Sequence, residues 1–322
     1  MPPSPRYLKA YHSGMLREST NRAYALLARC RLCARFCEVD RTAGEKGYCS
    51  ITDKAVVSSY GPHFGEESPL VGHGGSGTLF LTSCNLLCTF CQNYEISHLR
   101  QGEEMGPRQI ARIMLSLQRR GCHNINFVTP SHQLPFLLDA LGIAAEGGLT
   151  IPLVWNCGGY ESMESLSLLD GIIDIFMPDF KFWSIGPALE LLNASDYPEV
   201  ARKALKEMQR QVGDLVMDEE GIAFQGLLIR HLVMPENICG TEKLLQWIAR
   251  ELSPSAYVNL MAQYRPCFRA GDYGPARRGI TDSEYRQALL WGREQGLRLD
   301  TDSSPRHKAF RIWDFLDNGE GR

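Results

Sequence analysis

From residue 77 onward, short apolar runs alternate with longer segments in which apolar residues recur at helical spacing. The apolar runs predict main strands at residues 78–82, 125–129, 152–156, 172–177, 226–233 and 257–262. The amphipathic segments predict helices at residues 107–120, 135–146, 162–169, 197–212, 241–252 and 282–295. Such alternation is typical of a parallel sheet with right-handed crossovers. We therefore expect an α/β fold, a partial (β/α)6 barrel of the TIM type.

The beginning and the end of the chain do not follow this alternation. Residues 16–29 predict a short helix, and a segment rich in cysteine and turn residues follows it. We expect a small cysteine-rich metal-binding module over residues 1–58 and a barrel domain over residues 59–300. Glycine and proline recur over residues 59–77, which predicts a loop that leads to the first barrel strand. Residues 301–322 are expected to form a C-terminal tail.

Length, composition and charge indicate which class of protein the chain belongs to. The chain has 322 residues with 44% hydrophobic content, enough for one large domain and a small appendage. The net charge of −3 gives no reason to expect broad binding to nucleic acid or to anionic membranes. No apolar run resembles a leader peptide or reaches the ~18 residues of a membrane span, so we expect a cytoplasmic protein. In that compartment, clustered cysteines indicate metal sites before disulfides.

Three of the eleven cysteines lie in one short stretch. Cys84, Cys88 and Cys91 follow the first predicted strand with three and then two residues between them. This spacing lets three thiolates converge on one small metal centre. Structural zinc sites and ordinary iron–sulfur sites use four protein ligands. A cluster held by three cysteines would keep one iron open, and an open iron is a place for chemistry.

The surrounding segment, GSGTLFLTSCNLLCTFCQNYEIS, resembles the signature of radical S-adenosylmethionine (radical SAM) enzymes. It is most similar to the branch described as pyruvate formate-lyase activating enzyme-like, and the resemblance covers roughly residues 60 to 300. The resemblance implies that Cys84, Cys88 and Cys91 hold a 4Fe-4S cluster whose fourth iron is chelated by SAM. One electron from the cluster would cleave SAM to methionine and a 5′-deoxyadenosyl radical that abstracts hydrogen.

The resemblance also implies a class of substrate. The branch name suggests hydrogen abstraction from a glycine of a glycyl radical enzyme, with flavodoxin or ferredoxin as the electron donor. Several strand ends depart from the family pattern, so radical modification of a small molecule or of a different peptide is the alternative. A non-catalytic iron–sulfur carrier or redox sensor is a third function, and the three-cysteine motif argues against it because a carrier would not cleave SAM.

Polar residues at the ends of later strands are the candidate contacts for SAM, because barrel sites form at the carboxyl ends of strands. These residues are Ser131, Asn156, Asp179, Lys181, Arg230 and Gln263. The segment from Asp179 to Lys181 matches the Asp-x-Lys pattern of the family, and both residues are candidates for catalysis. A surface ion pair is the alternative for them, and a helix cap is the alternative for Ser131. His231 is expected to face the opposite side of its strand from the residue before it.

Four further cysteines form the motif C-x2-C-x3-C-x11-C: Cys30, Cys33, Cys37 and Cys49. Four soft ligands can close a tetrahedral zinc site or hold a second iron–sulfur cluster, and the sequence leaves both open. Basic residues surround them, namely Arg29, Arg31, Arg35 and Arg41. These arginines either offset the charge of the thiolates or dock an acidic electron donor.

Acidic residues beside a histidine precede the first predicted strand. The segment from His63 to Glu67 contains Glu66 and Glu67 next to each other. A pair of acids there could serve acid–base chemistry. A solvated loop is the alternative.

Overall fold

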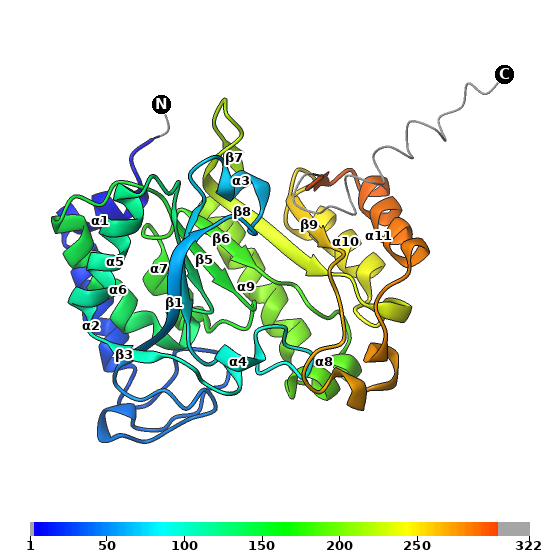
Figure 1. The fold of residues 1–322 in the computed structure, drawn as a ribbon, viewed down its shortest axis with the longest axis horizontal. Coiled ribbons are helices and arrows are strands. Elements are labelled where there is room, and N and C mark those ends of the chain that lie inside the picture. Colours follow the sequence, from blue (N-terminus) through cyan, green and yellow to red (C-terminus); the bar gives the residue numbers. More distant parts are fainter. Residues whose placement is uncertain (1–2, 302–322) are drawn as a thin grey trace.

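Seven parallel strands follow one another along a single mixed sheet (Figure 1). The computed structural model describes residues 3–301. The parallel strands are β2 (Ser76–Leu81), β4 (Ile125–Val128), β5 (Leu153–Cys157), β6 (Ile175–Pro178), β8 (Ala223–Leu232), β9 (Tyr257–Met261) and β10 (Arg298–Leu299). β1 (Ala55–His63) and β3 (Glu103–Met105) extend the β2 edge in antiparallel fashion, and β7 (Val216–Met217) pairs antiparallel with β8. Within residues 3–301 no pairing joins β3 to β10, so the sheet is open.

Helices connect the parallel strands and form a layer on one side of the sheet (Figure 1). They are α5 (Pro107–Arg119), α6 (Leu134–Glu146), α7 (Met163–Leu169), α8 (Ile185–Leu192), α9 (Tyr197–Val212), α10 (Thr241–Glu251) and α11 (Asp282–Glu294). Local signals fix their starts. Pro107 is the first residue of α5, and the side chain of Gln109 accepts a hydrogen bond from the Gly106 amide at 2.8 Å. Thr281 and Glu284 form a reciprocal capping box at the start of α11.

The sheet is covered on both faces, and each face has its own core. A large core of buried residues lies between the strands and the helices, and Phe127, Phe176 and Leu205 belong to it. A smaller core on the other face contains Val154 and Met177, with buried residues of β8 and β9. Leu70 of the short helix α3 (Ser68–Val71) closes this second core. Because both faces are covered, every residue of β5 and β6 is buried, as is typical of parallel strands.

The expected strands and helices of the alternating region are confirmed, with boundaries that differ by a few residues at most. Two other expectations were wrong. Residues 59–77 are not one loop, because they contain the end of β1, helix α3 and the start of β2. Gly61 and Pro62 lie within β1, where β3 pairs only with residues 55–57, so proline is tolerated at a free edge. The helix expected at residues 16–29 ends at Ala25, since turns that lead to the first cysteine follow it.

The N-terminal residues pack against the helix layer. Helices α1 (Arg6–Ser13) and α2 (Met15–Ala25) lie beside α6, and Tyr7, Leu16 and Leu27 belong to the large core. β1 crosses residue 58, where we expected the cysteine-rich module to end. The expected tail lies outside the described residues except for Thr301. No helix among residues 3–301 combines the length and the apolar character that a membrane span requires.

Candidate functional site

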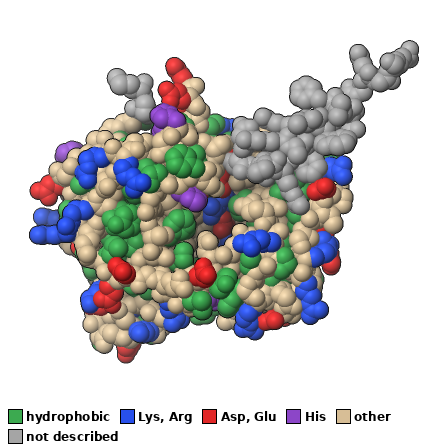
Figure 2. Space-filling view, viewed as in Figure 1, with side chains coloured by type: hydrophobic (Ala, Val, Ile, Leu, Met, Phe, Trp, Pro, Cys, Tyr) green, Lys and Arg blue, Asp and Glu red, His purple; other side chains and the backbone are tan. Residues whose placement is uncertain are grey.

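A pocket of about 280 Å³ lies at the carboxyl ends of the parallel strands. Figure 2 shows a hollow near the middle of one face of the molecule, with charged side chains in its depth. The three-cysteine loop after β2 forms one wall of the pocket, and residues at the ends of β4, β5, β6, β8 and β9 form the others. The polar residues of the later strand ends that line it are Thr129, Asn156, Asp179, Lys181, Arg230 and Gln263.

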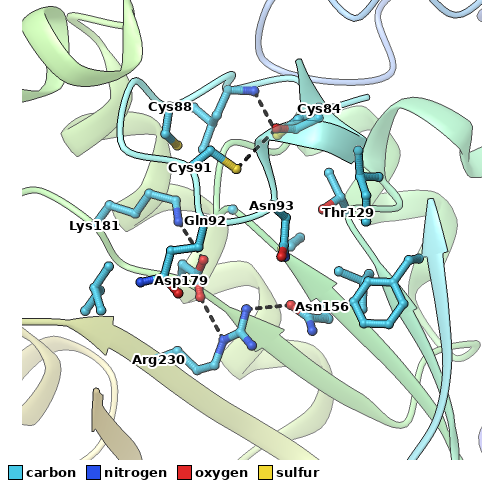
Figure 3. A pocket seen from close by; sticks show the side chains of 18 of the residues that line it. Cys84, Cys88, Cys91, Gln92, Asn93, Thr129, Asn156, Asp179, Lys181 and Arg230 are labelled. Carbon is cyan, nitrogen blue, oxygen red and sulfur yellow. Dashed lines mark hydrogen bonds and ion pairs between the residues drawn. The ribbon is translucent and has the colours of Figure 1, made fainter. Parts of the chain in front are cut away.

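Cys84, Cys88 and Cys91 all line this pocket. Figure 3 shows their side chains on one side, with Arg230 and Asn156 on the opposite side and Lys181 and Asp179 between. Burial raises the pKa of Cys84 and of Cys88, and the charge of Lys181 opposes this effect at both thiols. Buried thiols of this kind stay protonated unless a metal binds them, because metal ions select the thiolate.

Polar groups of the surrounding chain contact two of the three sulfur atoms. The backbone amide of Leu86 donates to Cys84 Sγ at 3.3 Å, and the hydroxyl of Ser97 donates to Cys91 Sγ at 3.2 Å. Helix α4 (Tyr94–Ser97) supplies Ser97 directly after the loop. Such donors favour sulfur atoms that carry negative charge, as the sulfur atoms of an iron–sulfur site do.

A buried ion-pair network forms the wall opposite the cysteines (Figure 3). Lys181 Nζ donates to Asp179 Oδ2 at 2.6 Å, and Arg230 Nε donates to Asp179 Oδ1 at 2.7 Å. Burial alone would raise the pKa of Asp179, but the charges of Arg230 and Lys181 outweigh it and lower that pKa. Arg230 also donates to Asn156 Oδ1 at 2.7 Å. Lys181 and Asp179 therefore form an ion pair, and it is not the surface pair of the alternative, because only 16% and 17% of the two side chains are exposed.

Two more carboxyl groups approach the same arginine from the segment after β1. Arg230 lies 3.8 Å from Glu66 Oε2 and 3.9 Å from Glu67 Oε1. Their side chains are only 8% and 5% exposed, so the alternative of a solvated loop was wrong. Burial raises the pKa of both groups, and that of Glu67 reaches about 7. Burial therefore favours the protonated forms of Glu66 and Glu67, while the charges of Arg230 and Lys181 favour the ionised form of Asp179.

Not every expected contact reaches the pocket. Ser131 is 1% exposed and does not line it, and its hydroxyl donates to the buried carboxylate of Glu161. His132 lies beside it and bonds to the carbonyl of Thr82. Gln263 lies at the mouth of the pocket, where its backbone carbonyl accepts a hydrogen bond from the Gln92 side chain at 3.1 Å.

His231 faces the helix layer, as expected from strand alternation. Its ring nitrogens bond to the carbonyl of Phe180 and to the hydroxyl of Thr241, at 2.7 and 2.9 Å. Cys157, by contrast, lines the pocket at the end of β5, and burial raises its pKa well above the usual value. Burial therefore favours the neutral thiol of Cys157 in the pocket wall.

The four N-terminal cysteines lie in one compact region. Cys30, Cys33 and Cys49 are buried and Cys37 is half-buried. Their charges interact, since Cys30 and Cys49 both raise the pKa of Cys33 behind the larger effect of burial. The backbone amide of Tyr48 donates to Cys37 Sγ at 3.3 Å. Across residues 3–301, no three His, Cys, Asp or Glu side chains are close enough together to hold a single metal ion.

The arginines of this region differ in where they point. Arg29 and Arg31 are exposed and pair with Glu38 and Glu164. Arg41 is fully buried, and its Nη1 lies 3.8 Å from Cys30 Sγ and 2.8 Å from the carbonyl of His132. Arg35 turns toward the three-cysteine loop. Sequence reasoning did not find this inward direction, because nothing local distinguishes Arg35 from Arg31.

The chain is similar to two proteins of Methanocaldococcus jannaschii. No family model matches the sequence. The chain is 32% identical over 281 residues to a protein of Methanocaldococcus jannaschii described as "Uncharacterized protein MJ0674", and the match covers 85% of this chain and 77% of that protein. It is 28% identical over 160 residues to "Uncharacterized protein MJ0808" of the same organism, which covers 44% of this chain and 46% of that protein.

Proposed function

This chain belongs to the same family as the Methanocaldococcus jannaschii protein MJ0674, and we propose that it is a radical SAM enzyme that holds a 4Fe-4S cluster. The observation that carries the proposal is the pocket itself. Cys84, Cys88 and Cys91 share it with the buried pair of Lys181 and Asp179. Three sulfur ligands on one side of a pocket and fixed charges on the other suit a cluster with one open iron and a charged ligand bound to it.

The residues of the pocket fit this group. The Leu86 amide and the Ser97 hydroxyl donate to the sulfur atoms of Cys84 and Cys91, which suits thiolate ligands. When bound, the cluster and SAM would supply one electron, cleavage of the sulfonium, and a 5′-deoxyadenosyl radical that abstracts hydrogen. The protein supplies position, charge and exclusion of water.

The residues that line the pocket have different roles in this proposal. Lys181 has three N–H donors and uses one on Asp179, so two donors serve a ligand carboxylate such as that of SAM. Arg230 is bonded to Asp179 and Asn156, so it orients those two side chains. The hydrophobic residues Phe80, Ile96, Leu232 and Met261 line the rest of the pocket and limit the entry of water.

The proposal extends to fold and compartment. We take the open sheet with its helix layer as the partial (β/α)6 barrel that the family resemblance implies. All eleven cysteines are free thiols. A reducing compartment, the cytoplasm, keeps such thiols available for metal, and an open iron requires that protection. Cys30, Cys33, Cys37 and Cys49 would hold a second metal, zinc or another iron–sulfur cluster.

The decisive experiment is incubation of anaerobically reconstituted, dithionite-reduced protein with SAM. We expect 5′-deoxyadenosine to form in wild-type protein and in the control Cys122→Ala, and not in Cys88→Ala. Cys122 is a buried cysteine outside the pocket, so it controls for the loss of a thiol as such. Absence of 5′-deoxyadenosine in fully reconstituted wild-type protein would overturn the proposal.

The substrate class is decided by the origin of the abstracted hydrogen. A glycyl radical enzyme labelled with deuterium at glycine should transfer deuterium into 5′-deoxyadenosine if the protein is an activating enzyme. Transfer from a labelled small molecule or another peptide instead would identify direct radical modification. Reduction by flavodoxin or ferredoxin in place of dithionite tests the electron donor in the same assay.

A further inference from the structure

The side chain of Arg35 connects the N-terminal cysteine region to the three-cysteine loop. Its Nε donates to the carbonyl of Asn85 at 2.7 Å, and its Nη2 donates to the carbonyl of Leu86 at 3.3 Å. Both acceptors lie between Cys84 and Cys88. The same guanidinium donates to the carbonyls of Leu192 and Asn193 after α8, at 2.9 and 2.6 Å. Arg35 therefore joins three separate segments of the chain through its five N–H donors.

Tyr48 and Cys49 add two more connections to the same loop. The ring of Tyr48 lies under the Arg35 guanidinium, 3.8 Å from its central carbon, and the Tyr48 hydroxyl lies 3.5 Å from the carbonyl of Leu86. The hydroxyl of Ser83, the residue before Cys84, donates to the carbonyl of Cys49. In Figure 1 the loops of residues 30–50 lie at the same end of the molecule as α4, which follows the three-cysteine loop.

The backbone of the three-cysteine loop needs such support. Ser83 and Leu87 both have left-handed backbone conformations, with φ of 71° and 50°. Residues other than glycine adopt this region only where neighbouring contacts hold them. At Ser83 and at the residues just before Leu87, the N-terminal region supplies contacts through Arg35, Tyr48 and Cys49. The rest of the loop is held from elsewhere, for example by the bond of the Thr89 amide to the carbonyl of Leu191.

The contacting residues are themselves held beside the N-terminal cysteines. Arg35 lies between Cys33 and Cys37 in sequence, and its backbone amide bonds to the thiol of Cys33. Tyr48 is next to Cys49, and its amide donates to Cys37 Sγ at 3.3 Å. Both residues that contact the three-cysteine loop therefore belong to the N-terminal cysteine region.

We propose that residues 30–49 position the three-cysteine loop, with Arg35 as the positioning residue, so that their contacts are required for stable retention of the cluster at Cys84, Cys88 and Cys91. This inference rests on the proposed function, since it presupposes that cluster. It assigns the N-terminal region a task in addition to folding.

The test measures the rate at which iron leaves the anaerobic, reconstituted protein for a ferrous chelator, together with the electron paramagnetic resonance spectrum of the reduced protein. Arg35→Gln replaces the five donors of the guanidinium by a shorter side-chain amide and retains the four N-terminal sulfur atoms. Arg31→Gln is the matched control, because Arg31 is exposed and lies 3.7 Å from a carboxylate oxygen of Glu164. Ser83→Ala removes only the bond to Cys49. Iron at the pocket is the part lost when Cys88→Ala is added.

We expect Arg35→Gln to lose pocket iron about tenfold faster than wild type, the effect of one hydrogen bond to a charged group. Its spectrum should change, and Arg31→Gln should match wild type in both measurements. Ser83→Ala should also release pocket iron faster. If Arg35→Gln misfolds by circular dichroism, Ser83→Ala decides the question. Wild-type release rates and an unchanged spectrum in the folded variants would overturn the positioning role. A wild-type protein that holds no more iron than Cys88→Ala would instead overturn the proposed function.

Discussion

Arg230 Nε lies 2.7 Å from Asp179 Oδ1, and this contact joins the ends of two neighbouring parallel strands, β6 and β8, inside the pocket. The other oxygen of Asp179 accepts from Lys181, so each carboxylate oxygen has its own cation. All three side chains are at most 17% exposed. Without this carboxylate the two cations would repel each other, and the repulsion would be strong because their surroundings have low polarity.

Replacing Asp179 by Asn should therefore destabilise the fold. The variant leaves Lys181 and Arg230 buried side by side without the compensating charge, and loss of one partner from a buried network costs about 3 kcal/mol or more. Chemical denaturation at pH 7 measures the free energy of unfolding. The control is Glu251→Gln, which breaks an exposed pair with Lys206 and should cost less than about 1 kcal/mol. Equal effects of the two substitutions would contradict the importance of burial.

Stability should fall as the pH rises from about 4.5 to about 7, in part because of Glu67. Its pKa is about 7 in the folded protein, raised by burial from 4.5, while the charge of Arg230 opposes the rise and that of Glu66 adds to it. Between these two values the folded state binds more protons than the unfolded state, so the free energy of unfolding decreases as pH increases. Glu67→Gln cannot lose a proton at this position.

The measurement compares denaturation of wild type and Glu67→Gln at pH 5 and pH 8. We expect the wild type to lose more stability over this interval than the variant, by about 3 kcal/mol at most. Glu66 and Asp179 face the same arginine and retain their own titration in both proteins. Parallel pH profiles in the two proteins would show that Glu67 is not the group responsible.

Asp174 should be needed to attach helix α1 to the sheet. Its two oxygens accept hydrogen bonds from the backbone amides of Arg6 and Leu153, both at 2.8 Å. Asp174→Ala leaves both amides without these acceptors, at a cost of about 1–3 kcal/mol each where they are buried. The nearby Asp170→Ala, which removes only partly exposed ion pairs, is the control. Hydrogen exchange should accelerate at the amides of Arg6 and Leu153 in the first variant and not in the second.

Gly226 should be irreplaceable in β8. Its φ is 120°, and an added Cβ would lie 2.5 Å from the Cα of Leu215 and overlap the carbonyl oxygen of Asp214. Both the backbone conformation and the space therefore oppose a side chain. Gly226→Ala should lower the melting temperature markedly. Gly142→Ala in α6 meets nothing within 4 Å and should raise stability by about 1 kcal/mol, so an equal effect of the two would contradict the geometry.

Patterns confined to one segment predicted the fold well, and long-range contacts explain what they missed. The amphipathic pattern with an early proline gave α9 its observed bounds, Tyr197–Val212. Helix α8 was missed because its sequence, IGPALELL, contains glycine and proline near the start, which predict a turn. β1 was read in part as loop because Gly61 and Pro62 are unusual in strands, and only pairing with β2 holds them there.

In the candidate site, too, local patterns predicted some residues and missed those that depend on distant partners. Spacing identified the three cysteines, and strand-end position identified Asp179, Lys181 and Arg230, which the structure brings together in one pocket. The burial of Glu67 could not be read from its neighbours, because its partner Arg230 lies 163 positions away in the sequence. The inward turn of Arg35 likewise depends on the carbonyls of Asn85 and Leu86, which no local pattern reveals.

Tyr197 should matter for the chemistry of the pocket more than for the fold. Its hydroxyl lies 3.0 Å from the carbonyl of Gly158 and 2.9 Å from that of Asp179, and it accepts from the Lys181 amide at 2.9 Å. One hydroxyl thus fixes the backbone after β5 and after β6, including the two residues that form the buried ion pair. Tyr197→Phe removes these bonds with little change of volume, and should lower stability by about 1–3 kcal/mol.

The matched control is Tyr24→Phe, which removes a partly buried hydroxyl bonded to Asp139 far from the pocket. Both variants lose one tyrosine hydroxyl, but only Tyr197→Phe should slow the formation of 5′-deoxyadenosine, by about tenfold or more, because small displacements of positioned groups are costly in catalysis. The effect should appear at saturating SAM, since it concerns orientation after binding. If Tyr197→Phe cleaves SAM as fast as Tyr24→Phe, the position of Asp179 and Lys181 does not depend on this hydroxyl.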